Sequence, residues 1–230
     1  MKIYINENMI RRNKRIGQIT TIVSLAVLAI GLVLSFRNEV QTFTLSLVAL
    51  LIGFILSQVG IYFTNRWGRT PRPDQQLTAA LKGLEDKYSL YHYTTPVSHL
   101  LVGPAGVWIL LPYSMRGRIS YENGRWKQRG GNVLMKFFAQ EGLGRPDLEI
   151  KASISDLQRF LEKALPEEQV PPINAALVFT NQQAQIEVED SPYPTLSAEK
   201  LKDFIRRKGK ASKNGAEKIA LVQQILEQNL

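Results

Sequence analysis

The chain contains no cysteine and only two histidines among its 230 residues. The absence of cysteine excludes disulfide scaffolds and thiolate metal sites. Acidic residues are also scarce, since 20 aspartates and glutamates accompany 29 lysines and arginines and leave a formal charge of +9. The hydrophobic fraction of 44% is that of a globular protein, so a wholly disordered chain is excluded as well.

Familiar enzyme signatures are missing too. The sequence has no glycine-rich phosphate loop, no Gly-x-Ser-x-Gly elbow and no paired catalytic carboxylates. His92 and His99 fall on adjacent predicted strands, but a zinc site would need two further ligands. We therefore predict packed or surface histidines, no metal site and no cofactor.

Charge is absent from two long stretches near the N-terminus, residues 16–36 and 40–65, which contain 21 and 26 residues. About 20 apolar residues in a helix cross the roughly 30 Å hydrocarbon layer of a bilayer. We predict transmembrane helices over about residues 16–36 and 42–64. No small-x-small cleavage site follows the first stretch, so it is expected to stay as an anchor.

Basic residues flank both spans, whereas the connection at residues 37–39 is balanced in charge. The flanking residues are Arg11, Arg12, Lys14, Arg15, Arg66, Arg69 and Arg72. Because positively charged flanks stay in the cytoplasm, we predict a multi-pass cell-membrane protein with both termini cytoplasmic.

The short connection requires the two spans to form an antiparallel hairpin. Small residues allow close helix contact, and the candidates are Gly31, Ala49, Gly53 and Gly60. Gln58 is predicted to form a hydrogen bond across the hairpin rather than to line a pathway.

The chain therefore divides into a basic N-terminus (1–15), the hairpin (16–64), a juxtamembrane linker (65–73) and a cytoplasmic domain (74–230). In the domain, hydrophobic spacing predicts helices at 74–87, 150–165, 198–207 and 216–228. Strands are predicted at 88–93, 97–102, 107–113, 118–121, 125–127, 175–180 and 185–188. This order indicates an α/β domain with a mixed sheet flanked by helices.

The run VSHLLVGPAGVWIL at residues 97–110 resembles the nuclease-related domain (NERD) family, whose fold is similar to that of the PD-(D/E)xK nucleases. The resemblance covers most of residues 73–190. It includes the strand that begins at Gly117, the residue Trp126 after that strand, the later helix and the strand at residues 176–180. It implies a PD-(D/E)xK-like domain, and a membrane anchor before such a domain agrees with the family.

Members with the nuclease pattern carry an aspartate just before the His-Leu-Leu-Val run and a Glu-x-Lys on the next strand. Ser98, Leu111 and Tyr113 occupy these positions here, and Asp74 weakly matches an acid on the family's first helix. Leucine offers no metal ligand, and tyrosine cannot supply the positive charge of lysine at pH 7. We therefore expect no catalytic residues and a pocket without carboxylates for a divalent ion. Pro112 favours a strand edge or a bulge.

The segment PDLEIK at residues 146–151 contains the letters of the nuclease motif. The motif normally divides between two strands, whereas here its letters are contiguous at the start of a predicted helix. We therefore predict that Asp147 and Glu149 stabilise a helix N-terminus rather than bind a metal.

A basic stretch follows the meander and contains two aromatic residues. Its members are Arg116, Arg118, Tyr121, Arg125, Trp126, Lys127, Arg129 and Lys136, with Glu122 as the one acid among them. It is compatible with nucleic acid, with anionic lipid headgroups or with ordinary solvated surface. A second basic cluster, residues 206–213, has the same three interpretations.

The sequence thus predicts a membrane-anchored NERD-like protein that lacks nuclease active-site residues and acts as a binding or assembly module. A divergent Mg²⁺-dependent nuclease for DNA or RNA, using Asp74 and Glu122, is the alternative. A structural membrane protein that scaffolds an unknown protein partner is the second alternative.

Overall fold

The computed structural model describes residues 1–37, 39–130, 143–211 and 215–230. It divides into two compact units. One unit is a pair of helices, residues 7–72, and the other combines residues 1–6 with residues 73–230. The helical unit is therefore inserted in the chain between two segments of one α/β domain.

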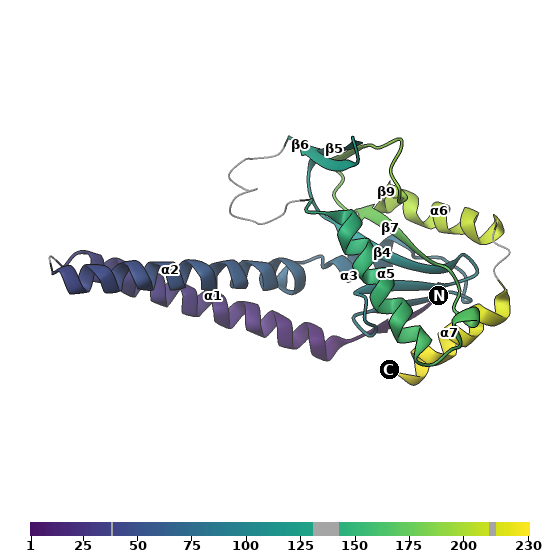
Figure 1. The fold of residues 1–230 in the computed structure, drawn as a ribbon, viewed down its shortest axis with the longest axis horizontal. Helices are drawn as coiled ribbons and strands as arrows, with labels where there is room; N and C mark the ends of the chain where they lie inside the picture. Colours follow the sequence, from purple (N-terminus) through teal and green to yellow (C-terminus); the bar gives the residue numbers. More distant parts are fainter. Residues whose placement is uncertain (38, 131–142, 212–214) are drawn as a thin grey trace. The chain divides into compact units, whose positions relative to one another are not determined.

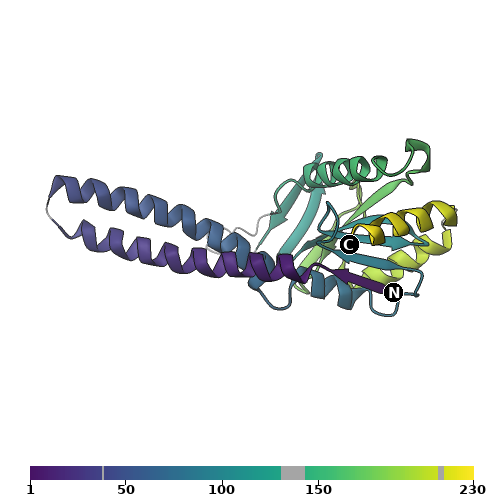
Figure 2. The ribbon, with the colours of Figure 1, turned by 90° about the horizontal axis from the view of Figure 1, so that it is seen from below.

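The helical unit is an antiparallel hairpin of α1 (Glu7–Ser35) and α2 (Val40–Phe63), seen side by side in Figures 1 and 2. A π-helical turn, η1 (Thr64–Gly68), continues α2. Both helices are long and apolar enough to cross a membrane. Their outward side chains are apolar, and Ile22, Leu25 and Leu51 are 67%, 62% and 61% exposed.

Small residues fill the contact between α1 and α2 at intervals of seven residues. Gly17, Ser24 and Gly31 are buried on α1, and Ser46, Gly53 and Gly60 are buried on α2. A seven-residue period keeps one face of a helix against its partner when the pair has a left-handed crossing.

Two of these contacts, at Gly60 and Gly53, leave no room for a larger side chain, and the contact at Gly31 is tight. A Cβ atom on Gly60 would lie 2.6 Å from Thr21 Oγ1, one on Gly53 2.7 Å from Leu28 Cγ, and one on Gly31 3.2 Å from Ala49 Cβ. The predicted close contacts are confirmed. Gln58 is half-buried, and its hydrogen bond across the hairpin stays a prediction.

The α/β domain is built on a mixed six-stranded sheet in the order β1-β2-β3-β4-β7-β9. Its strands are β1 (Lys2–Ile5), β2 (Ser89–His92), β3 (His99–Gly103), β4 (Gly106–Tyr113), β7 (Ile173–Phe179) and β9 (Thr195–Ser197). The meander β2-β3-β4 is antiparallel, whereas β1 runs parallel to β2 and β7 runs parallel to β4.

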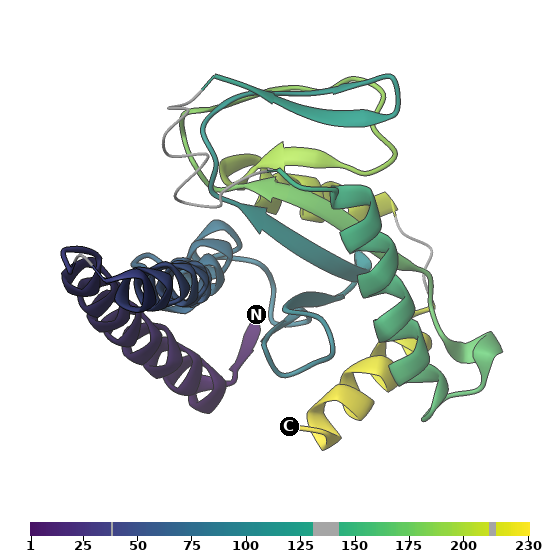
Figure 3. The ribbon, with the colours of Figure 1, turned by 60° about the vertical axis from the view of Figure 1, so that its left-hand side comes forward.

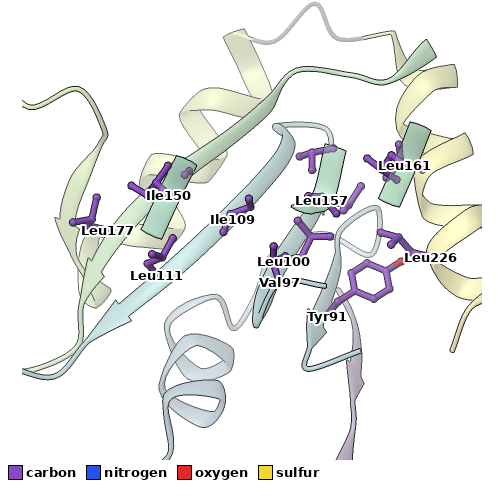
Figure 4. Packing of buried hydrophobic residues seen from close by; sticks show 14 of the residues in the cluster. Tyr91, Val97, Leu100, Ile109, Leu111, Ile150, Leu157, Leu161, Leu177 and Leu226 are labelled. Atoms are coloured by element: carbon purple, nitrogen blue, oxygen red, sulfur yellow. The ribbon is translucent and has the colours of Figure 1, made fainter. Parts of the chain in front are cut away.

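Helices cover both faces of this sheet. On one face, α5 (Pro146–Glu162) and α7 (Ala216–Gln228) enclose a core that includes Leu100, Ile109, Leu157 and Leu226, shown in Figure 4. On the other face, α3 (Pro73–Ala80) and α6 (Ala198–Ala211) enclose a core with Leu101 and Leu110. The alternation of buried residues along β3 and β4 produces this three-layer arrangement.

A smaller sheet joins β5 (Gly117–Glu122), β6 (Arg125–Arg129) and β8 (Ala184–Glu187) in the order β6-β5-β8, visible as a separate group of strands in Figure 3. Its hairpin turn is the predicted one, since Asn123 and Gly124 both have positive φ, at 52° and 72°. Two consecutive positive φ values are typical of the tight turn that matches strand twist.

The predicted α/β class with a mixed sheet and flanking helices is confirmed. Two strands, β1 and β9, were not predicted, and residues 7–15 continue α1 rather than forming a separate segment. The helix predicted over residues 74–87 ends at Ala80, where turns follow it.

Candidate functional site

The positions that the sequence resemblance assigned to the nuclease motif, Ser98, Leu111 and Tyr113, lie at one end of β3 and β4. Leu100 pairs with Ile109 in antiparallel register, and Ser98 precedes Leu100 by two residues whereas Leu111 follows Ile109 by two. Leu111 is buried in the core under α5, and Tyr113 is half-buried at its edge. The pairing of β3 with β4 ends before Pro112, which pairs only with β7. Pro112 therefore occupies a local strand edge, as predicted.

Asp74, the acid that the resemblance weakly matches, belongs to another element of the domain. It lies in the first turn of α3 and is only 1% exposed. The core residue Leu77 of α3 packs against the face of the sheet that carries Leu101, opposite to the face that carries Leu111. The acid predicted as a retained site residue is thus part of a helix on the other side of the sheet.

Two carboxylates nevertheless lie beside Tyr113, and they come from the segment that resembles the motif only in its letters. Tyr113 Oη donates a 2.9 Å hydrogen bond to Glu149 Oε2, and Trp126 Nε1 donates a 3.0 Å hydrogen bond to Asp147 Oδ1. The predicted helix start is confirmed, since Asp147 and Glu149 are in the first turn of α5. The expectation of a pocket without carboxylates was wrong, because the beginning of α5 approaches the end of β4.

These carboxylates change the chemistry of Tyr113 rather than creating a metal site. Burial, together with the negative charge of Glu149, raises the pKa of Tyr113 well above its usual value. The phenol therefore stays protonated and acts as a donor to Glu149. Across the described residues, the structure contains no group of three or more His, Asp or Glu side chains that could hold a metal ion.

The two histidines face each other across β2 and β3 and are both buried. Their Nδ1 atoms are 2.8 Å apart, so one ring donates a hydrogen bond and the other accepts it. His92 Nε2 lies 3.0 Å from the hydroxyl of Thr78 on α3. This contact links the meander to α3 and corresponds to the packed interpretation of the histidines.

The basic stretch forms one face of the smaller sheet. Cross-strand pairs share a face, and the pairs Arg118 with Arg129 and Ser120 with Lys127 alternate with the pair Tyr121 and Trp126. Trp126 packs toward the core under α5. The aromatic side chains Tyr121 and Trp126 and the cations lie on opposite faces of the smaller sheet, because successive residues of a strand alternate between faces.

Acidic residues accompany the cations on their face. Glu122 Oε2 lies 2.7 Å from Lys127 Nζ and 3.6 Å from Arg129 Nη2, and Glu187 Oε1 lies 3.2 Å from Arg118 Nε. The hydrogen bond from Lys127 holds the pKa of Glu122 below its usual value. The face is thus less positive than the sequence indicated.

Glu122, the second acid of the nuclease alternative, is engaged in this ion pair. Lys136 and Lys213 lie outside the described residues. In the second basic cluster, Arg206 donates a 2.8 Å hydrogen bond to the Gly83 carbonyl oxygen, which is a structural contact.

Comparisons with known proteins identify no relative of this chain. No family model matches it, and neither a curated protein nor a solved structure matches it.

Proposed function

We propose that the chain is a membrane-anchored protein whose α1–α2 hairpin spans the bilayer. Two observations support this proposal. The hairpin presents apolar side chains outward along both helices, and such an extended apolar surface needs lipid or a partner to cover it. Its interior is filled by glycine and serine, the small residues that typically bring membrane helices together.

The position of β1 supports a topology with both ends of the hairpin on one side of the membrane. Ile5 of β1 pairs with His92 of β2, so the residues before α1 and those after α2 belong to one sheet. A soluble domain cannot be divided across a bilayer. Together with the basic flanks, this pairing favours a cytoplasmic position for the domain and for both termini.

We further propose that the domain is of the NERD type with a PD-(D/E)xK-like fold. The order of elements supports this assignment. A leading helix (α3), an antiparallel meander (β2-β3-β4), a later helix (α5) and a strand parallel to the last meander strand (β7) follow one another as the sequence resemblance implies.

The domain is proposed to bind or to assemble rather than to cleave. The observation that carries this proposal is the group at the end of β4. Leu111 replaces a metal ligand with a buried hydrocarbon, and Tyr113 is a protonated donor to Glu149 where a nuclease would need a cation. A hydrolytic metal site has no ligand set among these side chains.

The full chain in detergent or in nanodiscs is the material for the test. A fragment starting at residue 73 would lack β1 and leave the edge of β2 unpaired. We expect no cleavage of DNA or RNA with Mg²⁺ or Mn²⁺. Metal-dependent cleavage that disappears in Glu149→Gln or Asp74→Asn, but persists in the matched surface variant Glu199→Gln, would establish the nuclease alternative instead.

A further inference from the structure

Positive charge is concentrated at one end of the hairpin. A Cβ atom on Gly17 would lie 3.0 Å from Phe63 Cβ and 3.1 Å from the Thr64 backbone nitrogen, so the start of α1 and the end of α2 lie together. That end carries seven cations and one acid, Glu7, for a net charge of 7 − 1 = +6. At the other end, Arg37 and Glu39 cancel.

The cations of α1 lie at the depth of lipid headgroups if the hairpin spans the bilayer. The 20 uncharged residues of α1 from Ile16 to Ser35 extend about 30 Å as a helix, close to the thickness of the hydrocarbon layer. Arg15 therefore lies at the boundary of that layer. Arg11 lies about 6 Å further out, still inside a headgroup layer about 5–8 Å thick.

The basic side chains at residues 11, 12, 14 and 15 of α1 are exposed, and their spacing allows two of them to contact the same anion. Arg15 is a helical neighbour of both Arg11 and Arg12, at spacings of four and three residues, and Lys14 lies beside them. Arg11 donates a 2.8 Å hydrogen bond to the Asn8 side chain. Within the described residues, Arg12, Lys14 and Arg15 form no salt bridge, so their charges are available to an anion of another molecule.

An aromatic cluster at the end of α2 and in η1 lies at about the same depth along the hairpin as Arg15. The ring of Trp67 lies 5.9 Å from that of Tyr62 and 5.1 Å from that of Phe63, and the Arg66 guanidinium lies 5.3 Å from the Trp67 ring. Tyrosine and tryptophan are enriched where the hydrocarbon layer meets the headgroups. Trp67 is buried, but Tyr62 is 48% exposed, so the position of Tyr62 and the depth of Arg15 agree on the position of the boundary.

We infer that Arg11, Arg12, Lys14 and Arg15 form a binding site for the headgroups of anionic phospholipids, which we call the α1 cationic band. Guanidinium groups bind phosphate oxygens through two parallel hydrogen bonds, and a phosphate shared by two arginines relieves their mutual repulsion. The inference depends on the proposed insertion of the hairpin.

The test uses the full chain reconstituted in phosphatidylcholine bilayers, with spin-labelled phosphatidylglycerol or phosphatidylcholine as the probe. We expect about a fivefold preference for phosphatidylglycerol, which corresponds to about 1 kcal/mol. Combined R11Q/R12Q/K14Q/R15Q substitution should abolish the preference. A charge-preserving variant, R11K/R12K/R15K, should keep only part of it, because the electrostatic attraction remains while the paired guanidinium hydrogen bonds are lost.

The matched control neutralises four cations on the smaller sheet, R118Q/R125Q/K127Q/R129Q, and should leave the preference unchanged. Equal association of the two lipids, or loss of the preference only in this control, would overturn the inference. Alkaline carbonate extraction distinguishes a failure of the proposed membrane insertion from a failure of the proposed lipid site. A protein released from the bilayers would end both proposals, whereas a retained protein without lipid preference would end only the lipid site.

Discussion

Glu149, in the first turn of α5, accepts a 2.9 Å hydrogen bond from the phenol of Tyr113 at the end of β4. The contact joins the start of a helix to the end of a strand, at the position where the proposed resemblance would place a lysine. The Glu149 carboxylate therefore accepts a hydrogen bond from a neutral donor, the protonated phenol of Tyr113. Two consequences of this contact can be measured, one for stability and one for its dependence on pH.

Tyr113→Phe should lower the free energy of unfolding by about 1 kcal/mol at neutral pH, because Glu149 loses its donor. The pKa of Tyr113 is raised in the folded state, so the protonated phenol contributes stability below about pH 10 that is lost as the pH rises above this value. The variant should therefore lose less stability than the wild type between pH 8 and pH 11 in denaturant titrations.

Glu149→Gln is the control for this prediction, since the amide oxygen remains an acceptor while the charge is removed. It should lower the pKa of Tyr113 from its raised value. Identical pH profiles for the wild type and the Tyr113→Phe variant would show that the phenol is not coupled to folding.

The sequence could not reveal this contact, although it correctly indicated both of its elements. Periodicity predicted the strand that ends at Tyr113, and the acidic first turn predicted the helix that begins near Glu149. Neither pattern predicts how close a strand end and a helix start lie in space when they are 36 positions apart in the sequence. Such distances depend on how the elements pack in three dimensions.

Residues 2–5 illustrate a different limit. KIYI is too short and too close to a long helix for its alternation to stand out, and its partner strand begins only at Ser89. Its pairing is a long-range contact across the whole hairpin. By contrast, Asn123 and Gly124 correctly predicted their turn, since the conformation of a tight turn is encoded by its own residues.

The strand β1 should contribute to domain stability through Tyr4. Its ring stacks on Tyr91 at 5.0 Å, and its hydroxyl donates a 2.6 Å hydrogen bond to Glu227. Tyr4→Ala should reduce the free energy of unfolding by about 2 kcal/mol. Ile3→Ala on the same strand, where the side chain is 42% exposed, should cost clearly less. Equal effects in chemical denaturation would contradict a specific role for Tyr4.

The hairpin contact should not tolerate a larger side chain at Gly60. A Cβ atom there would lie 3.1 Å from the Thr21 backbone nitrogen as well as 2.6 Å from the hydroxyl oxygen, so the helices themselves must separate. Gly60→Val should cost about 1–3 kcal/mol. It should also widen the distance between spin labels placed on cysteines at Gln18 and Tyr62. The control is Ala29→Val, which also introduces a valine but at an exposed position of α1. It should leave that distance unchanged.

Glu122 and Glu187 should control how strongly the smaller sheet attracts polyanions. Combined Glu122→Gln and Glu187→Gln substitution removes the two acids that lie among the cations of this face. The variant should elute from heparin at clearly higher salt than the wild type, because affinity for a polyanion rises with the number of unneutralised cations. Glu162→Gln and Glu199→Gln, which remove two charges elsewhere, should have a smaller effect. An unchanged elution position would show that this face does not meet the polyanion.

The central claim is that a membrane hairpin is inserted between two segments of one domain. Because the chain has no native cysteine, single cysteines can report its topology with a membrane-impermeant maleimide. In sealed vesicles of one orientation, we predict that Glu7→Cys and Lys163→Cys react from the same side and that Arg37→Cys reacts only from the other side. Labelling of all three positions from one side, or of Glu7→Cys and Lys163→Cys from opposite sides, would contradict the account.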